Sequence, residues 1–334
     1  MPLGIFVTNR QNRATMRADV AGMQNKMKLL MLGAGSVGGF FGLRLQEGGA
    51  DVTFLVRPKR AAQLRERGLR LYGPRGEMHF KQLQLLESDA PARGSFDAVI
   101  LSCKAYDLQS AMDSVRPYLG INTIILPLLN GLRHLEVLDQ AFGAARVLGG
   151  LAQVSATLNA DGDIKQLTEV QALVYGARSA AQAASAAALD SALQLGKFES
   201  RLSRNIMLEM WEKFVLLASL AGMTCLMRAN VGEIAATQDG AALMLRMLDD
   251  CAAVATAAGN APRPIYMAPI KALLTQRNSL LEASMRRDME QGRATEADHV
   301  VGDMLRRARA AGIESELLKA AYSSLQAYEH RRST

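Results

Sequence analysis

A glycine-rich segment near the start of the chain constrains its fold more than any other feature. The segment matches G-x-G-x-x-G and follows the short apolar run 28–32. Apolar residues after it predict a helix, so the first glycine would permit a tight turn, the second would let backbone approach a pyrophosphate, and the third would let the helix pack on the strand. We predict a dinucleotide site here rather than a merely glycine-rich connection. Its expected cofactor-binding residues are Gly33, Gly35, Ser36, Val37 and Gly38.

Apolar runs and helix-like stretches continue to alternate after this segment. Buried strands are predicted at 51–56, 96–101 and 121–129, with helices near 59–67, 105–116 and 132–140. This alternation is typical of a parallel sheet covered by helices. We therefore predict an α/β, Rossmann-type domain with a mostly parallel sheet.

Three further regions complete the predicted organisation. Residues 69–86 predict short antiparallel strands, as an insertion or an edge, and 147–178 predict further strands, followed by an Ala-rich helix at 179–195. From about residue 205, strand patterns give way to long Leu/Ala/Met-rich helices, which predict an all-α second domain. We assign residues 1–27 to a disordered or extended leader, 28–200 to the nucleotide-binding domain and 201–334 to the helical domain, which would carry substrate and catalytic residues.

Composition narrows the class of protein. The net charge is +7, which suits an ordinary surface or a polyanionic ligand; the basic residues are scattered, so nucleic-acid binding is not expected. The three cysteines show no metal-ligand spacing, which favours a reducing cytoplasm and no metal site. No uninterrupted run of eighteen apolar residues occurs, so we expect no membrane span. The leader lacks the apolar middle of a secretory signal, and we expect folding to begin near Met27.

The end of the second predicted strand indicates which dinucleotide is bound. An acidic residue there suits the ribose 2′-hydroxyl of NAD, whereas arginine suits the 2′-phosphate of NADP. Here Arg57, Lys59 and Arg60 follow the strand. We predict NADP(H), with Arg57 and Arg60 as its ligands; a solvated basic loop is the alternative.

Three polar segments are candidates for the reacting groups. Lys104 and Asn130 each follow a predicted parallel strand, at the sheet edge where ligands bind in open α/β folds. Lys213 lies early in the first long helix of the second domain. Each has a structural alternative: a solvated loop cation for Lys104, a plain turn for Asn130-Gly131, and a surface ion pair with Glu209 for Lys213.

Taken together, these segments resemble the ketopantoate reductase (2-dehydropantoate 2-reductase) family. The similarity covers roughly residues 28–325, and its most specific part is the segment at 283–302. The matching pieces are GAGSVGG at 33–39, the Arg-bearing loop at 57–60, SCKAYD at 102–107, LLNG at 128–131, WEK at 211–213, NVGEI at 230–234 and ASMRRDMEQGRATEADHVVG at 283–302.

The resemblance implies an NADPH-dependent oxidoreductase that reduces a 2-oxo acid, and it assigns roles. Lys213 would be the general acid, with a pKa lowered by burial or by Lys104. Glu296 would hold the substrate hydroxyl or the acid lysine, and Ser284 would contact the substrate carboxylate. Lys104 and Asn130 would line the nicotinamide side and orient cofactor and substrate.

The chain departs from the family on the face of the helix that carries the lysine. The family usually has asparagines four and eight residues after the lysine, where this chain has Leu217 and Ala221. The family also commonly has glutamine just before the asparagine, where this chain has Leu129. Without the amides the case for ketopantoate weakens, unless these two positions are ordinary helix core. The leading hypothesis is an NADPH-dependent ketopantoate reductase that makes D-pantoate for coenzyme A synthesis. A related reductase of a more apolar 2-oxo acid or ketone is the second hypothesis, and a non-catalytic dinucleotide-binding protein is the third. A homodimer is possible.

Overall fold

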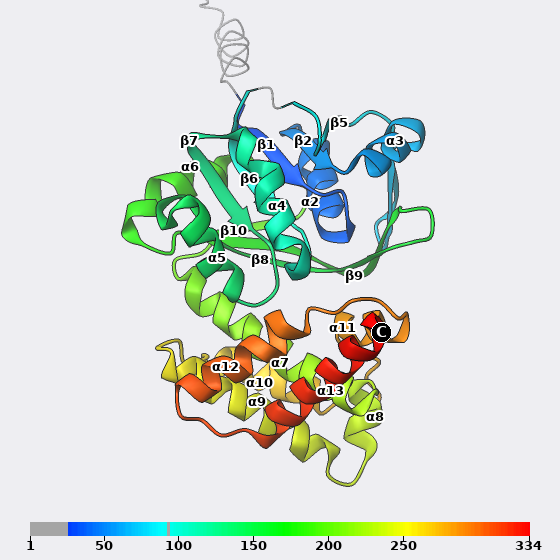
Figure 1. Cartoon of the computed structure of the whole chain (residues 1–334), viewed down its shortest axis with the longest axis vertical. Coiled ribbons are helices and arrows are strands. Elements are labelled where there is room, and N and C mark those ends of the chain that lie inside the picture. The colour runs from blue at the N-terminus through cyan, green and yellow to red at the C-terminus, as the bar shows by residue number, and fades with distance from the viewer. Residues whose placement is uncertain (1–25, 92–93) are drawn as a thin grey trace, which may run out of the picture.

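The computed structural model describes residues 26–91 and 94–334. Figure 1 shows an α/β part above a part made of helices, joined by the long helix α7. Most of the predicted leader, residues 1–25, lies outside the described residues. The predicted division into an α/β part followed by helices is confirmed by this arrangement.

The first sheet is entirely parallel and has the strand order β5-β2-β1-β6-β7. Apolar residues fill both faces of its central strands, as expected for a sheet that is covered on both sides. Its strands are β1 (Lys28–Leu32), β2 (Asp51–Val56), β5 (Gln84–Glu87), β6 (Phe96–Leu101) and β7 (Leu119–Pro127). Its helices are α2 (Ser36–Glu47), α3 (Pro58–Arg67), α4 (Leu108–Val115) and α5 (Arg133–Phe142).

A second five-stranded sheet was only partly predicted. The antiparallel pair expected within 69–86 exists as β3 and β4, but β5, in the same stretch, is a parallel strand of the first sheet. β10 was not predicted, because its four residues are mostly exposed and show no apolar pattern. The strands of the second sheet are β3 (Leu69–Gly73), β4 (Gly76–Phe80), β8 (Gly149–Leu158), β9 (Ile164–Gly176) and β10 (Glu199–Leu202), and the Ala-rich helix α6 is Ala183–Leu193.

Helix α2 lies between the two sheets, and its glycines allow the close packing. A Cβ on Gly42 would lie 2.5 Å from the Phe54 ring of the first sheet. A Cβ on Gly39 would lie 2.7 Å from Ile164 of the second. Both contacts are shorter than atoms can approach, so glycine is required for a helix to fit between two layers here.

The helical part is built around α7 (Ile206–Met227), which contacts α9 and α13 along its length. Asn205 caps its first turn by accepting a hydrogen bond from the Leu208 amide. The other elements are α8 (Val231–Ala236), α9 (Gly240–Ala257), α10 (Pro264–Leu274), α11 (Ser284–Glu290), a π-helical turn η5 (Asp298–Gly302), α12 (Asp303–Ala310) and α13 (Glu316–Ser333). β10 spans Glu199–Leu202 and α7 begins at Ile206, so the boundary proposed at 200/201 falls inside β10, the last strand of the second sheet.

Among the described residues, one helix is long and apolar enough to span a membrane by length and composition, and it is α7. Of its most apolar window, 72% is buried inside the molecule. This burial is what the core helix of a helical layer requires.

Candidate active site

The carboxyl edge of the first sheet gathers the segments that the sequence singled out. Leu101 of β6 pairs with Leu32 of β1 and with Pro127 of β7, so the three following loops leave the sheet at the same level. Ser102 ties two of them together by donating from Oγ to the Leu32 carbonyl, at 2.8 Å. The edge faces the helical part (Figure 1).

The glycine-rich loop has the shape that a pyrophosphate needs. Gly33 has φ of +88°, a backbone conformation that favours glycine. A Cβ on Gly38 would lie 2.1 Å from Ser102 Oγ and 2.6 Å from the Gly33 carbonyl oxygen, so the helix and loop fit together only with glycine. A Cβ on Gly35 would instead meet open space. No neighbouring protein atom therefore requires a glycine at position 35. The open space there instead suits the close approach of a bound ligand.

The N-terminus of α2, directly after the glycine-rich loop, is suited to bind a negative charge. Gly35 occupies the N-cap position and supplies no side chain to the first turn. Ser36 and Val37 follow as the first residues of the helix, where amide N–H groups and the helix dipole favour an anion. The residues present therefore fit a dinucleotide phosphate.

The two predicted 2′-phosphate ligands lie in different environments. Arg57 is exposed over 72% of its side chain and pairs with Asp107 at 3.0 Å, measured from Nη2 to Oδ1. Arg60 is half-buried and donates from Nη2 to the carbonyl oxygens of Ala34, at 3.0 Å, and Gly162, at 2.7 Å. Arg60 thus holds the glycine-rich loop against the second sheet, and Arg57 is the arginine whose side chain stands in solvent beside that loop.

Lys104 and Glu296 meet across the two parts of the molecule. Lys104 Nζ lies 3.2 Å from Glu296 Oε2 and 3.4 Å from Asp288 Oδ2. The Ala105 amide donates to Glu296 Oε1 at 3.0 Å, which fixes the carboxylate on both oxygens. Burial lowers the pKa of Lys104, but the charges of Glu296 and Asp288 outweigh it and hold that pKa above its ordinary value. Lys104 is therefore a cation held at the sheet edge by two carboxylates, although 41% of its side chain is exposed to solvent.

Lys213 lies on α7 and is the one site lysine with a lowered pKa. Burial lowers the pKa of its ammonium to about 8, and the charge of Glu296 opposes the shift. Its Nζ donates to the Ala152 carbonyl of β8 at 2.8 Å. The alternative of a surface ion pair with Glu209 is wrong, because Glu209 accepts from Ser203 Oγ and pairs with Arg201. Of the two causes proposed for the low pKa, burial acts and Lys104 does not.

Asn130 and Ser284, the other two predicted substrate-binding residues, lie in segments next to Lys104 and Glu296. Asn130 is half-buried in the loop after β7, and the next residue, Gly131, has φ of +78°. Ser284 is exposed at the start of α11, one helical turn before Asp288, which contacts Lys104. Residues four apart share a helix face, so Ser284 lies on the side of α11 that faces the site.

The two departures from the family pattern are apolar in the fold as well. Ala221 is buried, and Leu217 packs against the same core of the helical part. The face of α7 that carries Lys213 is therefore apolar at both of these positions. A ligand hydroxyl beside these positions would find no hydrogen-bond partner in their side chains.

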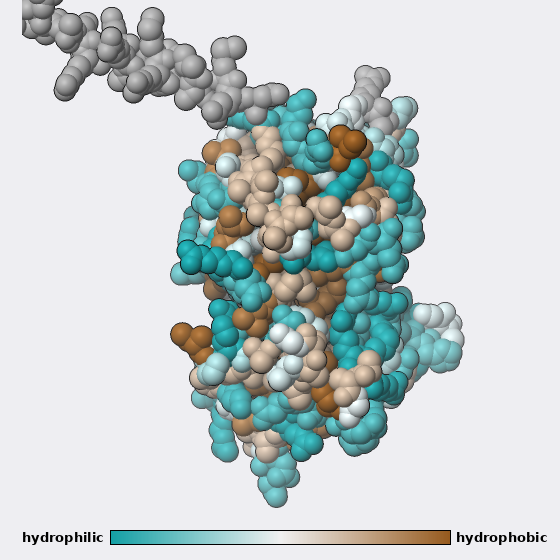
Figure 2. Space-filling view, turned by 90° about the vertical axis from the view of Figure 1, so that its left-hand side faces the viewer, coloured by the Kyte–Doolittle hydropathy of each residue, from teal (hydrophilic) through white to brown (hydrophobic). Residues whose placement is uncertain are grey.

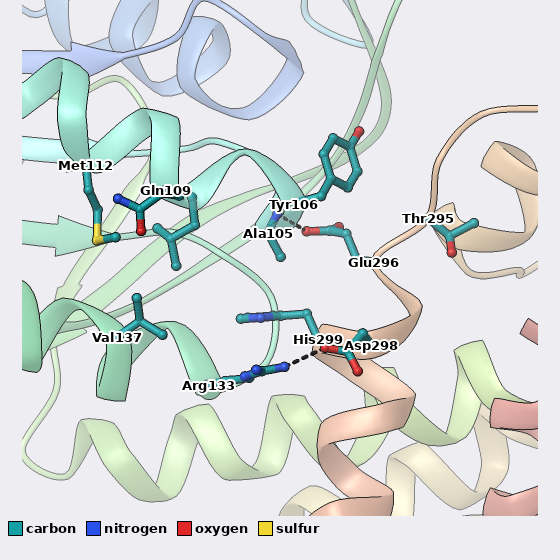
Figure 3. Close-up of a pocket in the computed structure, with 11 residues that line it drawn as sticks. Ala105, Tyr106, Gln109, Met112, Arg133, Val137, Thr295, Glu296, Asp298 and His299 are labelled. Atoms are coloured by element: carbon teal, nitrogen blue, oxygen red, sulfur yellow. Dashed lines mark hydrogen bonds and ion pairs between the residues drawn. The ribbon is translucent and has the colours of Figure 1, made fainter. Parts of the chain in front are cut away.

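A pocket of about 330 Å³ opens beside Glu296. Figure 3 shows that its upper wall carries Ala105 and Tyr106, while Arg133 and Asp298 close it below with an ion pair. The remaining lining residues come from α4, α5 and the turn around η5, and are Leu108, Gln109, Met112, Val137, Thr295 and His299. Among the described residues, no group of three or more His, Cys, Asp or Glu side chains is arranged to hold a metal ion.

Several residues of the site were not predicted. Asp288 stood in the family-like segment but received no role, although its spacing from Ser284 places both on one face of α11. Asp107 was not connected with Arg57, and His134 and His299 were not considered. These contacts join residues 50 or more positions apart, and no local pattern could have indicated them.

Comparison with known proteins agrees with this geometry. Residues 29–180 match the family described as "Ketopantoate reductase PanE/ApbA", and residues 205–329 match "Ketopantoate reductase PanE/ApbA C terminal". The "Uncharacterized oxidoreductase YkpB" of Bacillus subtilis (strain 168) is 35% identical over 303 residues, which are 91% of this chain and 99% of that protein. The 2-dehydropantoate 2-reductase of Lactococcus lactis is 25% identical over 69% of this chain and 73% of its own length.

A solved structure shows the same fold. The ternary structure of D-mandelate dehydrogenase with NADH and anilino(oxo)acetate superposes with a TM-score of 0.82 at 21% identity, covering 92% of this chain and 100% of that one. The family profiles span both parts of the molecule and include Lys104, Lys213 and Glu296. The resemblance inferred from the motifs is thus confirmed: the chain belongs to the ketopantoate reductase family and is an NAD(P)-dependent oxidoreductase of 2-oxo acids.

Proposed function

We propose that the chain reduces 2-dehydropantoate (ketopantoate) to D-pantoate with NADPH, in pantothenate and coenzyme A biosynthesis in the cytoplasm. The observation that carries this proposal is Lys213, an ammonium held against β8 with its pKa lowered to about 8. An acid of this strength is protonated at neutral pH and gives up its proton readily.

The residues divide the chemistry among them. A bound nicotinamide supplies the hydride that attacks the substrate carbonyl carbon. The carbonyl oxygen gains negative charge, and Lys213 Nζ stabilises that charge and donates the proton. The 2-oxo acid, NADPH and one proton thus give the 2-hydroxy acid and NADP⁺.

The other site residues orient the reactants. Glu296, fixed by the Ala105 amide and Lys104, has the position to hold a substrate hydroxyl near the acid lysine. Lys104 and Asn130 line the nicotinamide side, and Ser284 receives the substrate carboxylate. Orientation matters because a misplacement of about 1 Å can reduce the rate roughly a hundredfold.

Selection of NADPH is assigned to Arg57 and Arg60. Arg57 is exposed next to the glycine-rich loop, and its guanidinium can bind a 2′-phosphate through two N–H groups. Arg60 shapes the same loop through Ala34.

A second substrate class is supported by a specific observation. Leu217 and Ala221 belong to the apolar core along the lysine face of α7. An apolar wall suits a 2-oxo acid without the hydroxyl of ketopantoate. The structural relative named D-mandelate dehydrogenase, with anilino(oxo)acetate bound, has the same fold. A reductase of an apolar or aromatic 2-oxo acid is therefore the alternative.

The test follows loss of NADPH absorbance with ketopantoate and with a panel of apolar 2-oxo acids. Lys213→Ala should abolish turnover, whereas Lys271→Ala, which removes an exposed lysine on α10 that pairs with Asp249, should not. Turnover of ketopantoate supports the leading proposal, and turnover restricted to apolar acids supports the alternative. NADPH binding without any turnover would refute both and favour a non-catalytic role.

Assembly into a homodimer is also proposed. Figure 2 shows a strip of neutral and hydrophobic side chains running down one face, interrupting its hydrophilic surroundings. Light scattering at several concentrations tests this; a constant mass of one chain would contradict it.

A further inference from the structure

Two histidines that the proposed chemistry does not use meet beside the site. His134 lies in the first turn of α5, four residues after Asn130, and His299 lies in η5, three residues after Glu296. His134 Nδ1 and His299 Nε2 are 3.3 Å apart, and the rings stack with centroids 5.6 Å apart. In Figure 3 the His299 ring extends from its turn toward α5.

Both rings are buried, with 0% exposure for His134 and 8% for His299. Burial lowers the pKa of each ring below its ordinary value. The pKa of His134 is lowered further by His299, Arg178 and Lys213. Two neutral rings can share one N–H, and each ring then presents one donor and one acceptor nitrogen.

Around His299 carboxylates outnumber cations, but burial has the largest effect on the pKa of its ring. Glu296, Asp303 and Asp298 raise its pKa, and Arg133 lowers it, after the larger effect of burial. Burial therefore keeps both rings neutral at physiological pH, and the two neutral rings share one hydrogen bond.

Folding energetics alone do not explain this pair. His134 Nε2 is buried and has no hydrogen-bond partner among the described residues. A buried nitrogen without a partner costs on the order of 1–3 kcal/mol, which two apolar side chains of similar size would avoid. The pair is thus a costly way to fill this space.

What the pair does hold is the relative position of two site segments. A Cβ on Gly131 would lie 3.0 Å from the His299 carbonyl oxygen and 3.2 Å from its ring, so the Asn130-Gly131 turn rests directly on His299. The His299 amide donates to the Glu296 carbonyl at 3.1 Å. His299 therefore touches the Asn130-Gly131 turn of the α/β part and is hydrogen-bonded to Glu296 within the helical part.

We propose that His134 and His299 are positioning residues for the reduction: their mutual hydrogen bond locks the Asn130 turn against the Glu296 turn across the two parts of the molecule. The π-helical geometry of η5 directly after Glu296 supports a functional constraint on this segment, because such turns are frequent at functional sites. This inference rests on the proposed function, which makes Asn130 and Glu296 site residues.

Matched substitutions separate hydrogen bonding from packing. His134→Asn and His299→Gln keep a polar atom near Nδ1 and Nε2, respectively, while His134→Leu and His299→Leu remove it. We expect each Leu variant to lower kcat about 10- to 100-fold with a smaller change in KM for NADPH. The Asn and Gln variants should recover most of kcat, and the double Leu variant should be no slower than either single one, because residues that act as a unit are non-additive.

A control variant addresses simple loss of stability. Ser315→Ala removes a part-buried hydrogen bond to Asp250 of α9 and the N-cap of α13, and neither interaction involves a site residue. It should lower the unfolding temperature and leave kcat unchanged. If the Leu variants behave like Ser315→Ala, or if their effects on kcat are additive, the positioning role is refuted.

A measurement without turnover keeps this test separate from the proposed function. The chain has four histidines, and the other two, His79 and His330, are exposed. In NMR spectra of protein labelled with 15N-histidine, the His134 and His299 rings should stay neutral and hydrogen-bonded as the pH falls through about 6.5, the ordinary pKa of imidazole, because burial lowers the pKa of both rings. Four rings titrating alike would overturn the inference. Failure to reduce any 2-oxo acid, with the neutral pair observed, would instead refute the proposed function.

Discussion

The pH dependence of reduction is the sharpest consequence of where Lys213 lies. Burial lowers the pKa of this ammonium to about 8. About nine-tenths of the enzyme would then carry the proton at pH 7 and about one-tenth at pH 9, if the ordinary value of about 10.4 is replaced by one near 8. Since only the protonated lysine can donate, kcat/KM should be level below neutral pH and fall about tenfold per pH unit above pH 8.

Two substitutions should change this pH profile in different, predictable ways. Glu296 raises the pKa of Lys213, so Glu296→Gln should move the falling limb to lower pH. Lys213→Arg keeps the charge but cannot release a proton in this range, because arginine stays protonated above pH 12 or so. Its residual activity should be low and should lack that limb.

The assay measures kcat/KM for the 2-oxo acid at saturating NADPH, in overlapping buffers at constant ionic strength. A limb above about pH 10, the value for an exposed lysine, would show that Lys213 is not desolvated when it acts. The same limb persisting in Lys213→Arg would show that another group titrates. The first result would refute the lowered pKa of Lys213, and the second would refute its assignment as the general acid.

The remaining predictions concern the cofactor loop and the helical part. Gly38→Ala places a Cβ 2.1 Å from a serine oxygen and 2.6 Å from a backbone carbonyl, so it should destabilise the fold by about 1–3 kcal/mol in thermal unfolding; Gly35→Ala meets open space and should fold normally but weaken NADPH binding, measured by cofactor fluorescence. Asp107→Asn frees the arginine that it now pairs with and should raise the preference for NADPH over NADH; an unchanged ratio of kcat/KM would contradict this. Arg263→Ala removes the two hydrogen bonds that its guanidinium donates to Glu212, which is 1% exposed, and keeps the one from its backbone amide. It should cost about 1–3 kcal/mol in denaturant unfolding.

The sequence determined the parts of this protein whose requirements are local. The glycine-rich turn could be predicted because Gly33 has a positive φ and Gly38 lies against the Gly33 carbonyl, so part of the demand for glycine arises within the motif itself. Four of the five strands of the first sheet could be predicted because a strand buried on both faces is a continuous apolar run. β5 is the exception, because its residues are only partly buried. The helices after residue 205 are similarly encoded in their composition, and the motifs around Lys213 and Glu296 identified the family.

The tertiary structure decided which of these residues act on one another. Lys104 and Glu296 are 192 positions apart, and their contact makes one a fixed cation and the other a fixed anion. The low pKa of Lys213 arises from burial against β8. His134 and His299, 165 positions apart, carry no local signal at all. Hydrogen bonds and desolvation depend on distances between segments that only folding brings together, so sequence patterns supplied the candidates and the packing of the two parts assigned their chemistry.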